Sequence, residues 1–170
     1  RLLKENPSSL YAANARLSLA ESAILSGDSA NARVQLQTLI QNPQTDASLL
    51  KRALAHLIRI EITAGNWESV NQLGEQYQSR YPDDDFRNDA DFYRAEALLN
   101  QDKPTAAGNV LETLFEKRNQ PDIKQASWFP RLWVLQAEVA IRQKKYDRVF
   151  QLAEEMILVA ETKPFRYQMQ

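Results

Sequence analysis

The chain contains no cysteine, so disulfide bonds and thiolate metal sites are excluded. It has a single histidine, His56, and no second histidine with which to form a zinc site. No stretch approaches the roughly 20 consecutive apolar residues that a membrane-spanning helix needs. We therefore expect no metal ion, no cofactor and no direct insertion of this chain into a membrane.

An excess of charge of one sign is also missing. Lys and Arg together number 21, and Asp and Glu together number 22. The parts before and after Arg80 are each close to neutral as well. A general nucleic-acid-binding protein carries a basic excess on the binding domain, so we expect no nucleic acid among the partners.

The residues of common catalytic sites do not converge in this sequence. No nucleophile-elbow sequence accompanies His56, so a Ser–His–acid hydrolase is not indicated. Paired acids such as Glu154 and Glu155 are expected on solvated helix faces. The run Asp83–Asp85 lacks the glycine and the terminal glutamate of a calcium-binding loop. We therefore expect that the chain is not an enzyme.

Glycine is scarce, with four residues, yet two of them occur in similar phrases. Gly27 lies in ILSGDSANA, and Gly65 lies 38 residues later in ITAGNWESV. A glycine in the left-handed conformation often ends a helix, and a following Asp28 or Asn66 can cap the next helix. We expect two matching helix–turn–helix units here. Two further turns without glycine are expected to use Asn100 or Lys144.

The prolines are regularly spaced. Five of them, at positions 7, 43, 82, 121 and 164, lie 36, 39, 39 and 43 residues apart. Proline ends a helix, so regular prolines predict regular helix ends. Apolar residues between them recur at three- and four-residue steps, as in Ala13, Leu17, Ala20 and Ile24, and no stretch alternates as a strand would. The sequence predicts an all-α chain, and its period is typical of a solenoid.

The chain resembles the tetratricopeptide repeat (TPR), a helix–turn–helix unit with small residues where its helices cross. Matching small residues in the first and second helices are Ala20, Ala95, Ala137, Ala32 and Ala107, whereas Ile58, Val70 and Val149 are larger. The aromatic positions match at Trp67, Trp133 and Tyr146, and the terminal proline matches at Pro43 and Pro82. The spacings between equivalent first-helix positions are 38, 37 and 42 residues, longer than the family's period of about 34.

The resemblance implies one right-handed α-solenoid domain, residues 1–170, of four helix pairs at approximately 8–43, 46–82, 83–121 and 127–164. The segment RYPDDDFRNDADFYRAEALL is similar to repeats of bacterial cell-envelope members, which favours the periplasm or cell envelope over the cytoplasm. The sequence lacks an initiator Met and ends without a helix cap, so we interpret it as part of a longer protein.

Tryptophan is expected mainly in the core. Trp67 and Trp133 fall at packing positions. Trp128 and Phe129 fall instead in the long connection before Pro130. They could cover that connection or offer an anchor to a partner, and we expect the first.

In TPR proteins the first helices line a concave groove, and carrying those positions over gives a candidate partner-binding set. The first pair contributes Asn14, Leu17, Glu21 and Ile24. The set in the other pairs comprises Arg52, His56, Arg59, Asp89, Phe92, Tyr93, Glu96, Arg131, Glu138 and Arg142. Arg52 and Arg59 could bind a carboxylate, and Phe92 and Tyr93 could grip an apolar side chain. The basic clamp of chaperone-tail-binding members is absent.

The sequence thus predicts a non-catalytic scaffold that binds another protein or a peptide segment with acidic and aromatic features. One alternative is a self-assembly module that forms homo-oligomers. Another is a regulatory helical domain of a larger enzyme.

Overall fold

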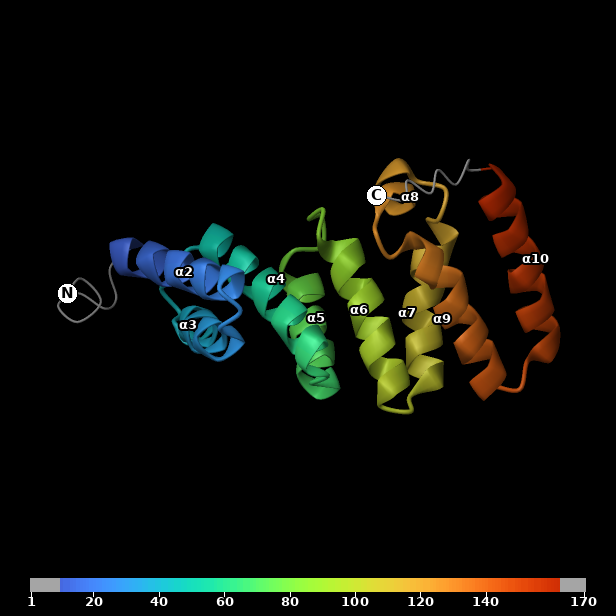
Figure 1. Ribbon diagram of the computed structural model, residues 1–170, viewed down its shortest axis with the longest axis horizontal. Coiled ribbons are helices and arrows are strands. Elements are labelled where there is room, and N and C mark those ends of the chain that lie inside the picture. Colours follow the sequence, from blue (N-terminus) through green and yellow to red (C-terminus); the bar gives the residue numbers. More distant parts are fainter. Residues whose placement is uncertain (1–9, 163–170) are drawn as a thin grey trace. The chain divides into compact units, whose positions relative to one another are not determined.

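The computed structural model describes residues 10–162, and these residues form nine helices and no strand (Figure 1). The prediction of an all-α chain is confirmed. The chain divides into two compact units, residues 1–93 and 94–170. The boundary falls inside helix α6 (Arg87–Asn100).

Unit 1 is built from helices that pack in chain order. They are α2 (Leu10–Leu25), α3 (Ser29–Gln41), α4 (Ala47–Ala64), α5 (Trp67–Arg80) and the first half of α6. α3 packs between α2 and α4, and α2 also contacts α4. Small residues allow these close approaches, since Ala20, Ala32 and Ala53 are all fully buried. Ile58, the larger residue at a position where the repeat has a small one, is accommodated in the same core.

Unit 2 contains the second half of α6, α7 (Pro104–Glu116), α8 (Pro121–Gln125), α9 (Phe129–Arg142) and α10 (Tyr146–Thr162). α9 packs between α7 and α10 (Figure 1). Trp128 and Phe129 are buried, and the Phe129 ring meets the Trp133 ring edge-on with centroids 4.8 Å apart. Both side chains are therefore packed inside unit 2 and are not available as an exposed anchor for a partner.

Four turns between paired helices have the same conformation. Their central residues, here called turn residues, all have positive φ: Gly27 at 79°, Gly65 at 70°, Asp102 at 57° and Lys144 at 59°. In each turn the N–H of the turn residue donates to the carbonyl three residues back, and the next N–H donates to the carbonyl five residues back, with N–O distances of 2.8–3.1 Å. This is the Schellman pattern of helix ends. The pairs α2–α3, α4–α5, α6–α7 and α9–α10 are therefore equivalent at their turns.

Of the two turns without glycine, one differs from the sequence prediction and one agrees with it. The third turn places Asp102, not Asn100, in the left-handed conformation, because α6 continues through Asn100. Lys144 does occupy that conformation in the fourth turn, as expected.

Of the two predicted helix caps, one is confirmed and the other is wrong. The Asp28 carboxylate accepts a hydrogen bond from the backbone N–H of Asn31 at 3.1 Å and caps α3. The Asn66 side chain does not cap α5, and its amide instead donates to Glu61 Oε2 at 2.5 Å. The buried carboxylate of Glu61 is an acceptor that must be satisfied, and it attracts the Asn66 amide away from the helix end.

The prolines mark helix ends only in part. α3 and α5 each end two residues before a proline, Pro43 and Pro82, as predicted. Pro121 does the opposite and begins α8, where a residue without an N–H costs nothing in the first turn. Pro7 and Pro164 lie outside the described residues.

The loop before α6 is held by Asp84. Its carboxylate accepts hydrogen bonds from Lys51 Nζ on α4 at 2.6 Å, from the Tyr77 hydroxyl on α5, and from the Phe86 N–H at 3.0 Å. Burial alone would raise the pKa of the Asp84 carboxyl, but these hydrogen bonds outweigh it and lower that pKa. Asp84 thus joins α4, α5 and the loop before α6 within unit 1.

Candidate protein-binding surface

In unit 1 the predicted groove residues of neighbouring first helices contact one another. The Arg52 guanidinium on α4 donates to Glu21 Oε1 on α2 at 2.5 Å. His56 Nε2 lies 3.2 Å from the same oxygen. Arg52 is exposed, while Glu21 and His56 are half-buried. The cation that was expected to bind a partner's carboxylate thus already has one within the chain.

The same ion pair recurs in unit 2. There the Arg131 guanidinium on α9 donates to Glu96 on α6. Arg131 stands thirteen residues before its turn residue, as Arg52 does, and Glu96 stands six residues before its own, as Glu21 does. The charge pattern is therefore repeated together with the turns.

The remaining charged residues of the predicted set are also engaged. The Arg59 guanidinium lies 4.9 Å from the centroid of the Phe86 ring, in cation–π geometry. Arg142 donates to Glu138 one turn earlier at 2.6 Å and to the carbonyl of Leu99 at 2.7 Å. Asp89 is half-buried.

The aromatic part of the predicted set is corrected. Phe92 is fully buried, so its side chain is not available to a partner, and its assignment as a contact residue is wrong. Tyr93 is half-buried and packs against the core of unit 1, with its ring centroid 5.8 Å from that of Phe92. Successive residues of an α-helix point about 100° apart, so Phe92 and Tyr93 cannot both face the same groove.

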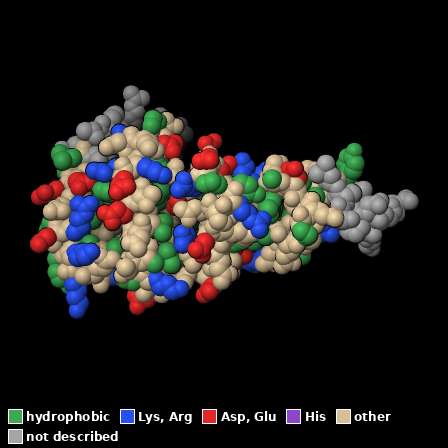
Figure 2. All heavy atoms as spheres, turned by 180° about the vertical axis from the view of Figure 1, so that it is seen from behind, with side chains coloured by type: hydrophobic (Ala, Val, Ile, Leu, Met, Phe, Trp, Pro, Cys, Tyr) green, Lys and Arg blue, Asp and Glu red, His purple; other side chains and the backbone are tan. Residues whose placement is uncertain are grey.

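The two ion pairs between first helices join an exposed cation to a less exposed anion. The side chains of Arg52 and Arg131 are 53% and 52% exposed, whereas those of Glu21 and Glu96 are 31% and 15% exposed. Figure 2 shows Lys and Arg side chains interspersed with Asp and Glu side chains on the face in view, with no large field of one sign. Binding here would depend on matched pairs of charges.

Unit 2 contains a hollow that the sequence did not predict. It has a volume of about 420 Å³ and lies among α7, α9 and α10, with Glu112, Gln136 and Lys145 in its lining. Beside it, Glu155 of α10 lies 3.8 Å from Arg118 and 3.5 Å from Arg148. Arg148 and Glu155 share α10, but Glu112 lies on α7 and Gln136 on α9, so no local spacing predicted this hollow.

Within residues 10–162 no group of three or more His, Cys, Asp or Glu side chains could hold a metal ion. None of the helices in that range combines the length and the apolar character that a bilayer crossing requires.

The chain was compared with known proteins. No protein-family model matches it, and neither the curated proteins nor the solved structures gave a significant match. The likeness to the tetratricopeptide repeat therefore rests on the chain's own residues.

Proposed function

We propose that this chain is a non-catalytic, TPR-like scaffold that binds a segment of another protein along its first helices. The observation that carries the proposal is the fourfold recurrence of one helix–turn–helix geometry, with φ between 57° and 79° at every turn residue. Chains built by repeating such a unit present extended surfaces on which partners bind.

The contact residues in unit 1 are Arg52, Arg59 and Tyr93. Both arginines are exposed, and the guanidinium group can bind a carboxylate through two parallel hydrogen bonds. Tyr93 is half-buried, so one edge of its ring can meet an apolar side chain while the rest stays packed. The ligand is therefore a protein segment with acidic residues and an apolar or aromatic residue between them.

In unit 2 the corresponding cation is Arg131, which is exposed and paired with Glu96. A ligand carboxylate would replace Glu96 there as it replaces Glu21 in unit 1. The internal carboxylates then act as competitors, because they keep the arginines from binding weakly acidic segments indiscriminately.

The test is a capture experiment followed by a titration with the purified captured protein. The variant Arg52→Glu, Arg59→Glu, Tyr93→Ala is expected to weaken binding by about tenfold or more, since it reverses two charges on the contact surface. The matched control is Arg80→Glu, Lys103→Glu, which changes the net charge equally at exposed positions outside the first-helix surface. Equal affinity of the wild type and the triple variant would overturn the proposed site.

A further inference from the structure

The second helices of the four pairs differ in how well they are covered. Five, nine and twelve residues after each turn residue, the first three second helices carry buried residues: Ala32, Leu36 and Leu39 in α3, Val70, Gly74 and Tyr77 in α5, and Ala107, Leu111 and Leu114 in α7. At the same positions of α10, Val149 is half-buried, and Ala153 and Met156 are exposed. α10 thus carries apolar side chains where its counterparts are covered, yet nothing described covers them.

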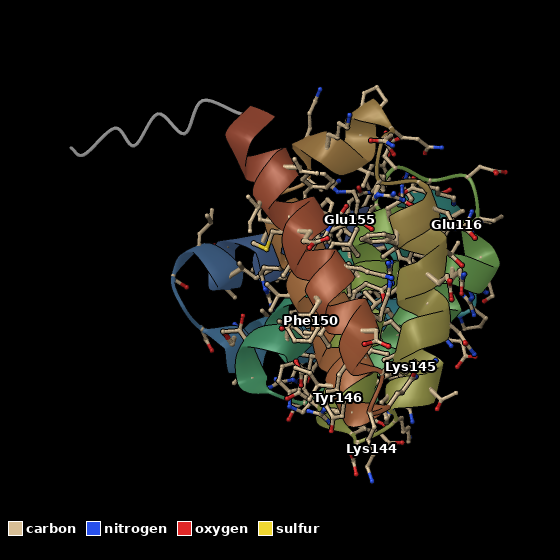
Figure 3. The ribbon with its side chains drawn as sticks, turned by 90° about the vertical axis from the view of Figure 1, so that its right-hand side faces the viewer. Glu116, Lys144, Lys145, Tyr146, Phe150 and Glu155 are labelled. Carbon is tan, nitrogen blue, oxygen red and sulfur yellow. The ribbon has the colours of Figure 1, made fainter. Side chains whose placement is uncertain are left out.

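The uncovered side of α10 is a continuous apolar stripe. Tyr146 is 57% exposed, Phe150 is 71% exposed and Ile157 is also largely exposed. Their spacing of four and seven residues places them on one face of the helix. Figure 3 shows Tyr146 and Phe150 on the side of α10 that is turned away from α7. A contiguous exposed apolar face of this kind indicates a docking surface.

Two covered helices show what lies against this face. On each of them, the residue six positions after the turn residue contacts the first helix of the following pair. The contacted residue on that first helix lies four or five positions before the turn residue of the following pair. On α3 the contacting residue is Arg33, whose Nε donates to Glu61 Oε1 of α4 at 2.6 Å. On α7 it is Gly108, where a Cβ would lie 3.1 Å from Cγ1 of Val139 on α9. Phe150 holds the equivalent position on α10 and has no such helix beside it among the described residues.

On α2, apolar side chains are exposed on the face that the other first helices pack against a second helix. Tyr11 is 76% exposed and Leu19 is 46% exposed. They stand sixteen and eight residues before their turn residue, where α4 has Leu49 and Leu57, which are both buried. α2 is the first described helix, and the face that other first helices turn toward a preceding second helix is open on it.

We propose that α10 of one copy docks against α2 of a second copy, so that the chain associates head to tail. The repeat register places Phe150 against Ser22 of the second copy, five residues before Gly27. Ser22 is exposed and small, so it leaves room for a phenyl ring, and its neighbour Ala23 is buried in the core of unit 1. The sizes are inverted at the internal contact, where the small Gly108 receives the larger Val139, so the two faces are complementary in volume.

Charge favours α2 over a second α10 as the occupant. The α10 stripe is flanked on one side by Asp147, one residue after Tyr146, and by Glu154, one residue after the exposed Ala153. An antiparallel pair of α10 helices would bring these acids of the two copies together. α2 carries one acidic residue, Glu21, which is already bound by Arg52 and His56. The inference is independent of the proposed partner site, because neither Phe150 nor Leu19 belongs to it.

Sedimentation velocity over micromolar to millimolar concentrations tests the proposal. The wild type is expected to grow beyond a dimer, because a head-to-tail contact leaves one open face at each end. Phe150→Glu and Leu19→Glu each bury an unpaired charge in the contact, so each alone is expected to stay monomeric, with association weakened by more than about tenfold. An equimolar mixture of the two variants keeps one intact α10 face and one intact α2 face, and it is expected to form a dimer and nothing larger.

The controls place the same substitution where the repeats are never covered. Leu158→Glu on α10 and Leu25→Glu on α2 occupy positions that are exposed in all four pairs. Both are expected to associate like the wild type. A wild type that stays monomeric throughout would overturn the proposal. So would a dimer that Phe150→Glu abolishes, that Leu19→Glu spares and that the mixture does not restore, because this result indicates an α10–α10 contact.

Discussion

α7 and α10 hold the same place in two successive helix pairs, yet one is covered and the other is not. Twelve residues after the turn residue, α7 has the fully buried Leu114, and α10 has Met156, which is 38% exposed. The residue types are alike, and both helices are joined to their first helices by the same turn. What differs is the neighbour, since α9 lies against α7 and no described helix lies on the outer side of α10.

This difference shows that burial in such an array is a property of the interface between pairs. A pair alone buries the side chains that face its own partner helix, such as Leu152 of α10, which is buried. The side chains on the next face are buried only by the following first helix. Stability is then a sum of contributions from each pair and from each interface between neighbouring pairs.

The largest difference in stability is expected when the two equivalent residues, Leu114 and Met156, are truncated to alanine. Leu114→Ala removes a fully buried side chain and is expected to lower the free energy of unfolding by about 2–5 kcal/mol. Met156→Ala removes a partly exposed one and is expected to cost less than about 1 kcal/mol. Urea unfolding at low protein concentration, where the chain is monomeric, measures both. Equal losses would show that α10 is covered as well as α7 is.

A second prediction concerns the position six residues after the turn. Gly108→Ala places a Cβ 3.1 Å from Val139 Cγ1, and overpacking of about 1–3 kcal/mol is expected to outweigh the roughly 1 kcal/mol that alanine gains over glycine inside a helix. Val139→Ala in the same chain should relieve that cost, because it removes the opposing methyl groups. Phe150→Ala at the matching position of α10 is expected to change stability by less than about 0.5 kcal/mol. A double-mutant cycle with additive losses at Gly108 and Val139 would contradict the contact.

A pH titration of the free energy of unfolding tests the contribution of Asp84, which lies in unit 1. The pKa of Asp84 is lowered in the folded chain, so its contribution is complete above the unfolded value of about 3.9. That contribution is lost as the pH falls through the folded pKa. Asp84→Asn is expected to be less stable than the wild type at neutral pH by about 1–3 kcal/mol, and to lose less stability on acidification. Parallel pH profiles of the two proteins would show that Asp84 contributes nothing.

The smallest effects on stability are expected at the turns that precede α7 and α10. Lys144→Gly places a residue without a Cβ at φ 59° and is expected to stabilise the chain by about 0.5–1 kcal/mol. Asp102→Gly should gain less, because Asp tolerates the left-handed conformation better than Lys does. Thermal unfolding of the two variants compares them, and a lower melting temperature for Lys144→Gly would mean that Lys144 contributes through its side chain.

Local patterns predicted the helices, the turns at Gly27, Gly65 and Lys144, and the cap at Asp28, because each depends on a few neighbouring residues. The sequence could not predict that Arg52 and Arg131 bind carboxylates of the preceding first helix. Those partners are more than thirty residues away, and only the packing of adjacent pairs brings them together. Phe92 was misassigned because the prediction placed both Phe92 and Tyr93 in the groove, whereas adjacent residues of a helix point in different directions.

Whether α10 receives α2 of another copy can be tested by cross-linking, since the chain has no cysteine of its own. A Phe150→Cys protein and a size-tagged Ser22→Cys protein would be mixed and oxidised, with Leu158→Cys and Leu25→Cys as the control pair. The head-to-tail account predicts that the mixed disulfide dimer dominates over both homodimers and over the control pair. Cross-linking of Phe150→Cys mainly to itself, or a mixed product no more abundant than that of the control pair, would contradict it.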